Sequence, residues 1–381
     1  MPLLPLDIPA GIYRNGTDLQ SQGRWRDSNL VRWHDGTMQP IQGWRLRSDS
    51  ATANITRSLS AWLDNSDNRW IAAGTYRKLY IYDVNSALYD ITPIGLTAGT
   101  ETSIDATAFG GGVYGSDGYG EPRLERSTGN PATTWSLDTF GQNLVACSSS
   151  DGKIYQWTLS TSTIAAQVTN APVGNTGIMV TDERFLFALG AAGNPRKVQW
   201  CDRENNTLWT PAATNEAGSI ELQTVGRIQC GVKVQNQALI LTTTDAHTAT
   251  YSGPPYVYGI ERVGTSCGIV SAQGVSVVDA GAFWMGKESF FMYSGGTVKE
   301  LECDVADYLY SDINVSQMAK VVAVSNAKFS EIRWFYPSDD NTENNRYVSF
   351  NYQENTWTIG QLARTAGVDA GVYRYPIYFD P

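Results

Sequence analysis

The sequence predicts an all-β protein: a β-propeller of about six blades, preceded by an extended N-terminal arm that carries a hairpin. Two observations lead to this prediction. The chain of 381 residues contains 12 Trp, 20 Tyr, 11 Phe and 36 Gly, a usage that favours strands and turns. A hairpin-like pattern also recurs along most of the chain, at a spacing typical of propeller blades. Charged residues make up only 17% of the chain, too few for a disordered or coiled-coil protein.

The first 56 residues form the predicted arm, which is rich in Arg and Trp. Within it, residues 30–38 read as two short strands joined at Asp35-Gly36, because this dipeptide readily adopts the positive φ angles of a tight turn. Pro40 has no N–H group and therefore places the returning strand at a sheet edge. We divide the chain into an arm at 1–56 and a propeller at 57–381.

From residue 57 onward, one unit recurs: an apolar strand, a short polar or glycine-containing turn, and a second strand that ends in aromatic residues. Six copies are visible, at 69–83, 143–158, 184–202, 238–253, 282–296 and 331–352. Their closing aromatics are Tyr82, Trp157, Trp200, Tyr251, Tyr293 and Tyr352, which follow one another at steps of 75, 43, 51, 42 and 59 residues. A period of about 40–50 residues is typical of a four-stranded propeller blade.

Two insertions account for the longer steps. A glycine- and tyrosine-rich loop at 101–134 lengthens the first step, and we expect it to connect two blades. A short helix at 304–312 lengthens the last step, because Val305 and Leu309 are spaced i, i+4. The final stretch, 371–381, reads as a strand that pairs either with residues beyond this chain's end or with the start of the first blade.

The charge balance argues against a surface that binds nucleic acid tightly. The chain has 28 Lys and Arg against 38 Asp and Glu, a net charge of −10. Affinity for phosphates comes from clustered cations that release counterions, which such a balance does not favour. It does not exclude a protein that nucleic acid slides past.

Neither the cysteines nor the N-terminus points to secretion. The cysteines are dispersed, with no CxxC pair and no neighbouring His to complete a zinc site, so we expect reduced, half-buried side chains. They are Cys147, Cys201, Cys230, Cys267 and Cys303. The N-terminus lacks the basic start and apolar run of a signal peptide, and no 18-residue apolar stretch occurs. We expect synthesis in a cytoplasm and no membrane insertion by the chain itself.

No motif in the sequence points to catalysis. Residues 149–155 come closest to the Asp box of sialidase-type propellers, but glycine follows Asp151 directly, which is typical of a hairpin turn. The two histidines, His34 and His247, are accompanied by no nucleophile elbow. The polar cluster at 339–344 has the oxygen ligands that calcium prefers, yet a solvated turn explains it better. We therefore expect no enzyme, no cofactor and no metal site.

The arm holds the candidate site residues of the chain. They are Arg24, Trp25, Arg26, Arg32 and Trp33. Arg with Trp is the composition of interface hot spots, because Arg forks onto carboxylates and Trp brings a large apolar area. The same residues could pack on the chain's own propeller, or stack on nucleic-acid bases. We interpret them as an interface and keep both alternatives open.

Several long segments resemble a known family. The opening IPAGIYRNGTDLQSQGRWRDSNLVRWHDGTMQPIQGWR at 8–45 resembles the N-terminal signature of tail proteins in short-tailed bacteriophages. The segments at 198–222 and 265–314, with EIRWFYPS and ENTWTIGQLART further on, are similar in the same way. Together they resemble the tail nozzle family, also called tail tubular protein B or phage stabilisation protein.

The resemblance implies a structural virion protein of the phage tail. Members of that family form a ring, a homohexamer, below the adaptor ring of the portal, and anchor the fibres or tip proteins of the distal tail. The genomic DNA passes through the channel of the ring without sequence-specific binding, and a wall rich in carboxylates would repel its phosphates. The implied partners are therefore further copies of the chain, the portal adaptor, fibre or tip proteins, and the DNA in the lumen. We expect the arm at 1–56 to dock onto the ring neighbour or the adaptor.

Two other functions remain open. A carbohydrate-binding or depolymerising tail propeller would contact the host surface through exposed Trp and Tyr, although the sequence identifies no carboxylate pair beside a pocket. A cellular propeller scaffold is disfavoured because WD signatures are absent.

Overall fold

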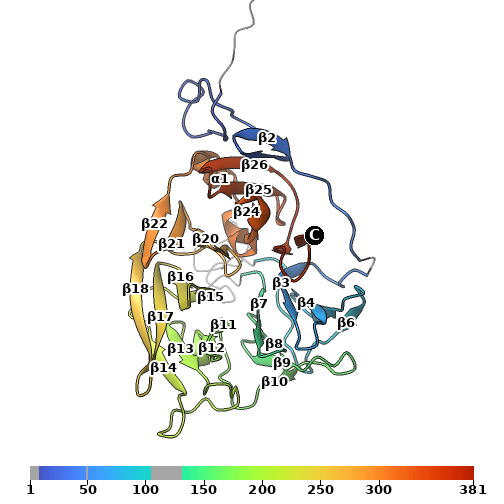
Figure 1. Ribbon diagram of the computed structural model, residues 1–381, viewed down its shortest axis with the longest axis vertical. Helices are drawn as coiled ribbons and strands as arrows, with labels where there is room; N and C mark the ends of the chain where they lie inside the picture. The colour runs from blue at the N-terminus through green and yellow to red at the C-terminus, as the bar shows by residue number, and fades with distance from the viewer. Residues whose placement is uncertain (1–7, 49, 104–130) are drawn as a thin grey trace, which may run out of the picture.

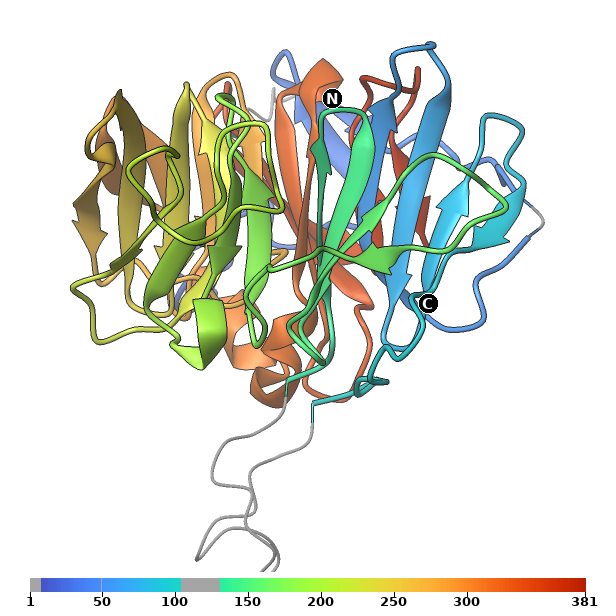
Figure 2. The same cartoon turned by 90° about the horizontal axis from the view of Figure 1, so that it is seen from below.

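A computed structural model of the chain describes residues 8–48, 50–103 and 131–381. Six four-stranded antiparallel sheets stand around one axis, each a meander whose first strand is innermost (Figure 1). This confirms the predicted all-β propeller of six blades. Seen from the side, the blades stand next to one another around the axis, and α1 lies at one end of them (Figure 2).

The blades follow the chain in order. Blade 1 contains β3 (Thr56–Leu63), β4 (Arg69–Thr75), β5 (Leu79–Tyr82) and β6 (Leu88–Asp90). Blade 2 contains β7 (Trp135–Phe140), β8 (Asn143–Ser148), β9 (Ile154–Trp157) and β10 (Ala166–Gln167). Blade 3 contains β11 (Gly177–Val180), β12 (Leu186–Leu189), β13 (Lys197–Trp200) and β14 (Gly218–Glu221). Blade 4 contains β15 (Ile228–Val234), β16 (Gln237–Thr242), β17 (Asp245–Gly253) and β18 (Val257–Thr265). Blade 5 contains β19 (Val275–Val278), β20 (Gly281–Met285), β21 (Phe290–Ser294) and β22 (Thr297–Leu301). Blade 6 contains β23 (Val322–Asn326), β24 (Glu331–Tyr336), β25 (Arg346–Asn351) and β26 (Thr356–Gln361). The hairpins visible in the sequence are therefore the second and third strands of each blade.

A seventh, smaller sheet closes the circle between blade 6 and blade 1. It consists of β27 (Ala366–Val368) and β28 (Ile377–Phe379), which pair with each other. The terminal strand thus pairs with β27, and not with the first blade as one of our two expectations had it. Gly367 allows β27 to approach blade 6 closely, because a Cβ atom at this position would lie 2.8 Å from Val324 Cγ2.

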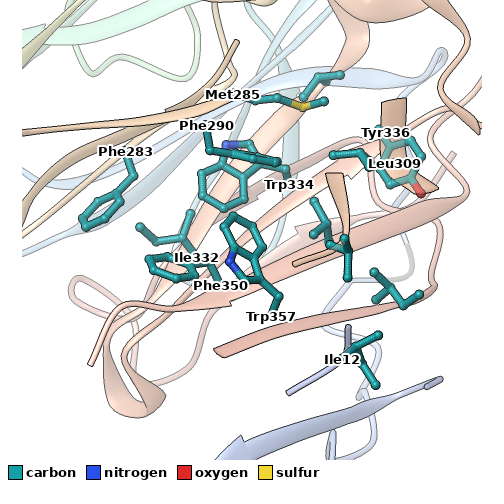
Figure 3. Packing of buried hydrophobic residues seen from close by; sticks show 14 of the residues in the cluster. Ile12, Phe283, Met285, Phe290, Leu309, Ile332, Trp334, Tyr336, Phe350 and Trp357 are labelled. Carbon is teal, nitrogen blue, oxygen red and sulfur yellow. The ribbon is translucent and has the colours of Figure 1, made fainter. Parts of the chain in front are cut away.

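The core lies between neighbouring blades, where wide aromatic side chains fill the wedge-shaped gaps. Between blades 5 and 6, Phe290 lies with its ring centroid 4.7 Å from that of Trp334 and 4.8 Å from that of Trp357 (Figure 3). Ile12 of the arm belongs to the same buried cluster. The arm therefore contributes to the core of the propeller.

The predicted hairpin of the arm is present as β1 (Val31–His34) and β2 (Thr37–Pro40). Asp35 and Gly36 at its tip have φ angles of 52° and 66°, which is the geometry that makes Asp-Gly favourable there. The chain then runs around the outside of the C-terminal strands before it enters β3 (Figure 1).

The predicted helix is present as α1 (Ala306–Asp312), with Leu309 buried; 3-10 turns follow at η2 (Val315–Lys320) and η3 (Ala327–Phe329), and η1 (Ala191–Gly193) lies in blade 3. No helix among the described residues is long and apolar enough to cross a membrane. Most of the predicted loop at 101–134 lies outside the described residues, but its ends meet, since Thr133 N donates to Thr100 O at 2.9 Å.

The five cysteines are free, as expected. Four of them are buried and only Cys303 is half-buried, so the expectation of half-buried side chains was wrong for most. They lie on strands or strand ends that face a neighbouring blade, where the thiol behaves as a small apolar group.

Candidate functional site

Two of the five predicted interface residues face the chain's own propeller. Trp33 is 3% exposed and belongs to the core between blades 5 and 6. Arg32 is 4% exposed, with Nε 3.1 Å from Glu331 Oε1 and its guanidinium 3.6 Å from the ring centroid of Phe329. Their prediction as docking residues is corrected: these neighbouring residues of β1 are both buried, Trp33 in the cluster between blades 5 and 6 and Arg32 against Glu331 and Phe329, so their side chains are unavailable to a partner.

The other three, Arg24, Trp25 and Arg26, lie in the loop before β1 and are more accessible. Trp25 is 38% exposed. Arg24 Nη2 lies 3.5 Å from Asp304 Oδ2, and Arg26 Nη1 lies 2.8 Å from Asp18 Oδ1. These ion pairs hold the loop in shape, and Trp25 keeps 38% of its surface exposed within it.

Further apolar side chains of the arm are exposed beside Trp25 in the sequence. Leu19, Leu30 and Met38 are 83%, 40% and 40% exposed. Together with Trp25 they are called the outer arm residues below. Sequence reasoning missed Leu30 and Met38, although Pro40 had placed the second strand at an edge, and an edge strand leaves one side of a hairpin without a neighbour.

The backbone of the arm is fixed to blade 6 and to the region before α1. Ile12 N donates to Trp357 O at 2.8 Å, and Arg14 N donates to Asp304 O at 2.7 Å. Ser28 Oγ donates to Ile359 O at 2.8 Å. The outer arm residues are therefore presented on an ordered support. The arm itself lies at the rim of the propeller (Figure 1).

A cavity of about 320 Å³ lies along the propeller axis. All seven innermost strands line it, through Leu59, Ser136, Ile178, Gly231, Val275, Ala323 and Gly367 among others. Its size is at the lower end of the range for small-molecule sites. Its wall is mixed: small and apolar side chains lie among polar ones, which include Ser136, Asp138, Gln229, Lys233 and Gln273.

Asp138 and Lys233 face each other near one end of this channel. Lys233 Nζ lies 3.8 Å from Asp138 Oδ1, and Val180 N donates to Asp138 Oδ2 at 2.8 Å. Burial raises the pKa of the Asp138 carboxyl, while the charge of Lys233 opposes the rise. A partly buried carboxyl beside an ammonium group is chemically able to accept or donate a proton.

One group of side chains has the composition of a metal site. The ligand atoms of His34, Asp35 and Glu354 lie within 4.8 Å of one another. Glu354 already accepts hydrogen bonds from Asp35 N at 2.6 Å and Gly36 N at 3.3 Å, so it caps the hairpin turn. The sequence could not associate these residues, because Glu354 belongs to blade 6 and the histidine to the arm.

The polar loop at 339–344 is only partly a solvated turn. Asn344 is fully buried, and Glu343 binds both Arg57 and Lys320. Burial alone would raise the pKa of Glu343, but the hydrogen bonds and charges of Arg57 and Lys320 outweigh it and hold the pKa below its usual value. This part of the loop is structural, and the expectation of a solvated turn holds only for its exposed residues.

The two histidines do not meet. His34 lies on the arm, whereas His247 is buried in blade 4, with Nε2 3.3 Å from Asp245 Oδ1. Asp245 also accepts hydrogen bonds from Thr224 at 2.8 Å and Thr242 at 2.5 Å. This buried group connects the ends of β16 and β17 to the segment before β15.

Comparison with known proteins shows the fold. No protein-family model matches the sequence, and no curated protein matches it. Virginiamycin B lyase from Staphylococcus aureus has a similar structure, with a TM-score of 0.51 and 9% identity over 83% of this chain and 89% of that chain. A streptogramin B lyase follows with a TM-score of 0.47 and 10% identity over 84% of this chain and 89% of that chain.

This likeness contradicts our expectation that the chain is not an enzyme. A protein of the same fold is a lyase, and the expectation rested on the absence of recognisable motifs in one sequence. A propeller assembles its sites from loops of different blades, so short motifs are a poor guide to them. At 9% identity the likeness shows the fold alone and transfers no reaction.

Proposed function

We propose that this chain is a subunit of the tail nozzle of a short-tailed bacteriophage, where copies form a ring around the channel through which DNA leaves. The resemblance of 8–45, 198–222 and 265–314 to the nozzle family supports the proposal. The portal adaptor and fibre or tip proteins are its proposed neighbours, and the virion tail its proposed location.

The observation that carries the proposal is the arm. A propeller closes its own sheets, yet this arm runs along the rim with one face buried against blade 6 and Leu19, Trp25, Leu30 and Met38 exposed on it. Exposed apolar side chains on an ordered support favour association, because little conformational entropy is lost on docking. Arg24 and Arg26 border Trp25 and supply the polar rim of such an interface.

The charge of the chain suits the same role. A net charge of −10 gives a ring of several copies a strongly negative field, which repels DNA phosphates and keeps the genome from adhering to the wall. Screening limits the effect to about 8–10 Å at physiological salt, which is short enough to act only on DNA inside the channel.

Assembly of the full chain tests this proposal. Isolated tails, or the chain expressed together with the adaptor, should contain a ring of about six copies by native mass measurement, the number following from the resemblance. Trp25→Ala combined with Leu30→Ala should abolish the ring. Tyr256→Ala, which removes an 82% exposed aromatic of blade 4, is the matched control and should assemble normally. The proposal would be contradicted if the chain were monomeric in tails, or if the Trp25→Ala, Leu30→Ala variant still formed the ring.

A second function rests on the central channel. The cavity beside Asp138 and Lys233 is large enough for part of a saccharide, and a tail propeller that binds or depolymerises host carbohydrate would use such a pocket. Incubation with host surface polysaccharide tests it. Release of oligosaccharides that stops in Asp138→Asn would establish this function, and absence of both binding and release would remove it.

A further inference from the structure

The seventh position of the propeller differs from the other six. It holds only β27 and β28, whereas every other position holds four strands. The outer part of the wedge between blades 6 and 1 is crossed by the chain segment that follows β2 (Figure 1). The exposed side chains at this place are Trp44, Arg45, Leu46, Arg47, Arg374 and Tyr375, which we call the seventh-blade surface.

The crossing segment is anchored at both sides of the small sheet. On the side of blade 6, the ring centroid of Trp44 lies 5.1 Å from that of Tyr378 and 4.6 Å from the guanidinium of Arg364. On the side of blade 1, the guanidinium of Arg47 lies 4.2 Å from the ring centroid of Tyr373. The surface is therefore ordered, although side chains and not a strand ladder hold it.

Large apolar area remains exposed on this ordered surface. Leu46 is 75% exposed, Tyr375 is 65% exposed and Trp44 is 46% exposed. Scattered single apolar side chains are normal on a protein surface, but Trp44 and Leu46 lie two residues apart on one anchored segment, and Arg47 of that segment contacts Tyr373 of the loop that carries Tyr375. Such a concentration is typical of a contact site. Trp and Tyr in particular contribute large areas with few rotatable bonds.

The same place is basic in an otherwise acidic chain. Five arginines lie on or beside the surface: Arg45, Arg47, Arg69, Arg364 and Arg374. Among the described residues, the carboxylate paired with them is that of Asp380, with Oδ1 2.6 Å from Arg364 Nη1. The carboxylates of Asp83 and Asp369 also lie close enough to act on Tyr373 and Tyr378. Five guanidinium groups against these three carboxylates still leave the place positive, in a chain whose net charge is −10.

We infer that the seventh-blade surface binds an acidic segment of another polypeptide. The guanidinium groups fit carboxylates in two-point geometry, and the Asp380 pair shows a carboxylate already bound at its edge. The exposed Leu46, Trp44 and Tyr375 fit apolar side chains interspersed among those carboxylates. A long polyanion such as nucleic acid fits less well, because beyond these arginines it would meet the negative field of the rest of the chain. The inference does not depend on ring formation.

A displayed library of random 12-residue peptides, selected on the full chain, tests this inference. The enriched peptides should carry several Asp or Glu together with aromatic or aliphatic residues. Their affinity, measured by fluorescence anisotropy, should fall at least tenfold in the double variant Arg45→Glu, Arg47→Glu. The double variant Arg203→Glu, Arg227→Glu changes the same number of exposed arginines in blade 3 and before blade 4, and should bind as the wild type does.

Three outcomes would overturn the inference. They are enrichment of peptides without acidic residues, equal loss of affinity in both double variants, and tighter binding of a 12-nucleotide oligothymidine than of the selected peptides with the same dependence on Arg45 and Arg47. Thermal unfolding of both variants at the wild-type temperature verifies that the comparison concerns binding and not folding. If the first pair of changes unfolds the chain, Leu46→Ser with Tyr375→Ser replaces it, with the same expected loss.

Discussion

Arg57 on the innermost strand of blade 1 forms a bidentate ion pair with Glu343 of blade 6. Nη1 lies 2.5 Å from Oε2 and Nη2 lies 2.7 Å from Oε1, although the residues are 286 positions apart. Lys320 Nζ donates to the same carboxylate at 2.7 Å. This buried ion triad connects the last four-stranded blade to the first, beside the small sheet of β27 and β28.

The ion triad predicts that removing one of its charges strongly lowers the stability of the fold. Glu343→Gln leaves Arg57 and Lys320, 2% and 0% exposed, without a counter-charge. We expect the free energy of unfolding to fall by about 2–4 kcal/mol, somewhat less than for a fully buried pair, because Glu343 remains partly exposed. Urea unfolding measures this. Asp340→Asn, in the same loop but exposed, is the control and should change stability by less than about 0.5 kcal/mol; equal effects would contradict the role of the triad.

The two tryptophans of the arm should behave differently in isolation. Trp33→Ala removes a side chain that is 3% exposed, so the free energy of unfolding should fall by about 3–5 kcal/mol. Trp25→Ala removes one that is 38% exposed and should cost less than about 1 kcal/mol. Thermal or urea unfolding of the isolated chain distinguishes them. Similar losses for both would mean that the loop around Trp25 also belongs to the core.

His247 predicts a pH dependence of stability. Burial lowers its pKa, and the carboxylate of Asp245 opposes the shift while Arg262 adds to it. The unfolded chain, with a histidine pKa near ~6.5, therefore binds a proton more readily than the native one, so stability falls as the pH drops below that value. Melting temperatures between pH 7.5 and 5 should decline in the wild type, and the decline should be shallower in His247→Gln. An unchanged slope would assign the pH dependence to other groups.

The cysteines should be unreactive in the folded chain. Burial raises the pKa of Cys201, Cys230 and Cys303 to about 12 and that of Cys267 to about 11, and only the thiolate attacks a disulfide reagent. An aromatic disulfide reagent at pH 8 should label less than about one thiol per native chain within an hour and all five in denaturant. Fast labelling of several native thiols would contradict the burial of these strands.

The sequence was sufficient for the blades because each second and third strand is local. The turn between them is short, and the aromatic that closes the unit packs against a neighbouring blade, so the period is visible without knowledge of distant contacts. The hairpin at Asp35-Gly36 was predictable for the same reason, since backbone chemistry of two residues determines it.

Contacts between distant segments were not predictable. Glu343 looked like part of a solvated loop, because its partners Arg57 and Lys320 come from another blade and from η2. Arg32 and Trp33 looked like interface residues, because no local pattern shows that one face of the arm packs on blade 6. Of the small seventh sheet, only the terminal strand was predicted, within 371–381; its partner β27 was missed, since it is only three residues long.

The mass of the native assembly, compared between wild type and the Trp25→Ala, Leu30→Ala variant, tests the proposed function most directly. The account predicts that wild-type chain in isolated tails, or coexpressed with the adaptor, forms a ring of about six copies. It also predicts that the variant, folded as judged by its unfolding transition, remains outside the ring. A wild-type chain that stays monomeric in tails, or a variant that assembles as completely as Tyr256→Ala, would contradict the docking role of the arm.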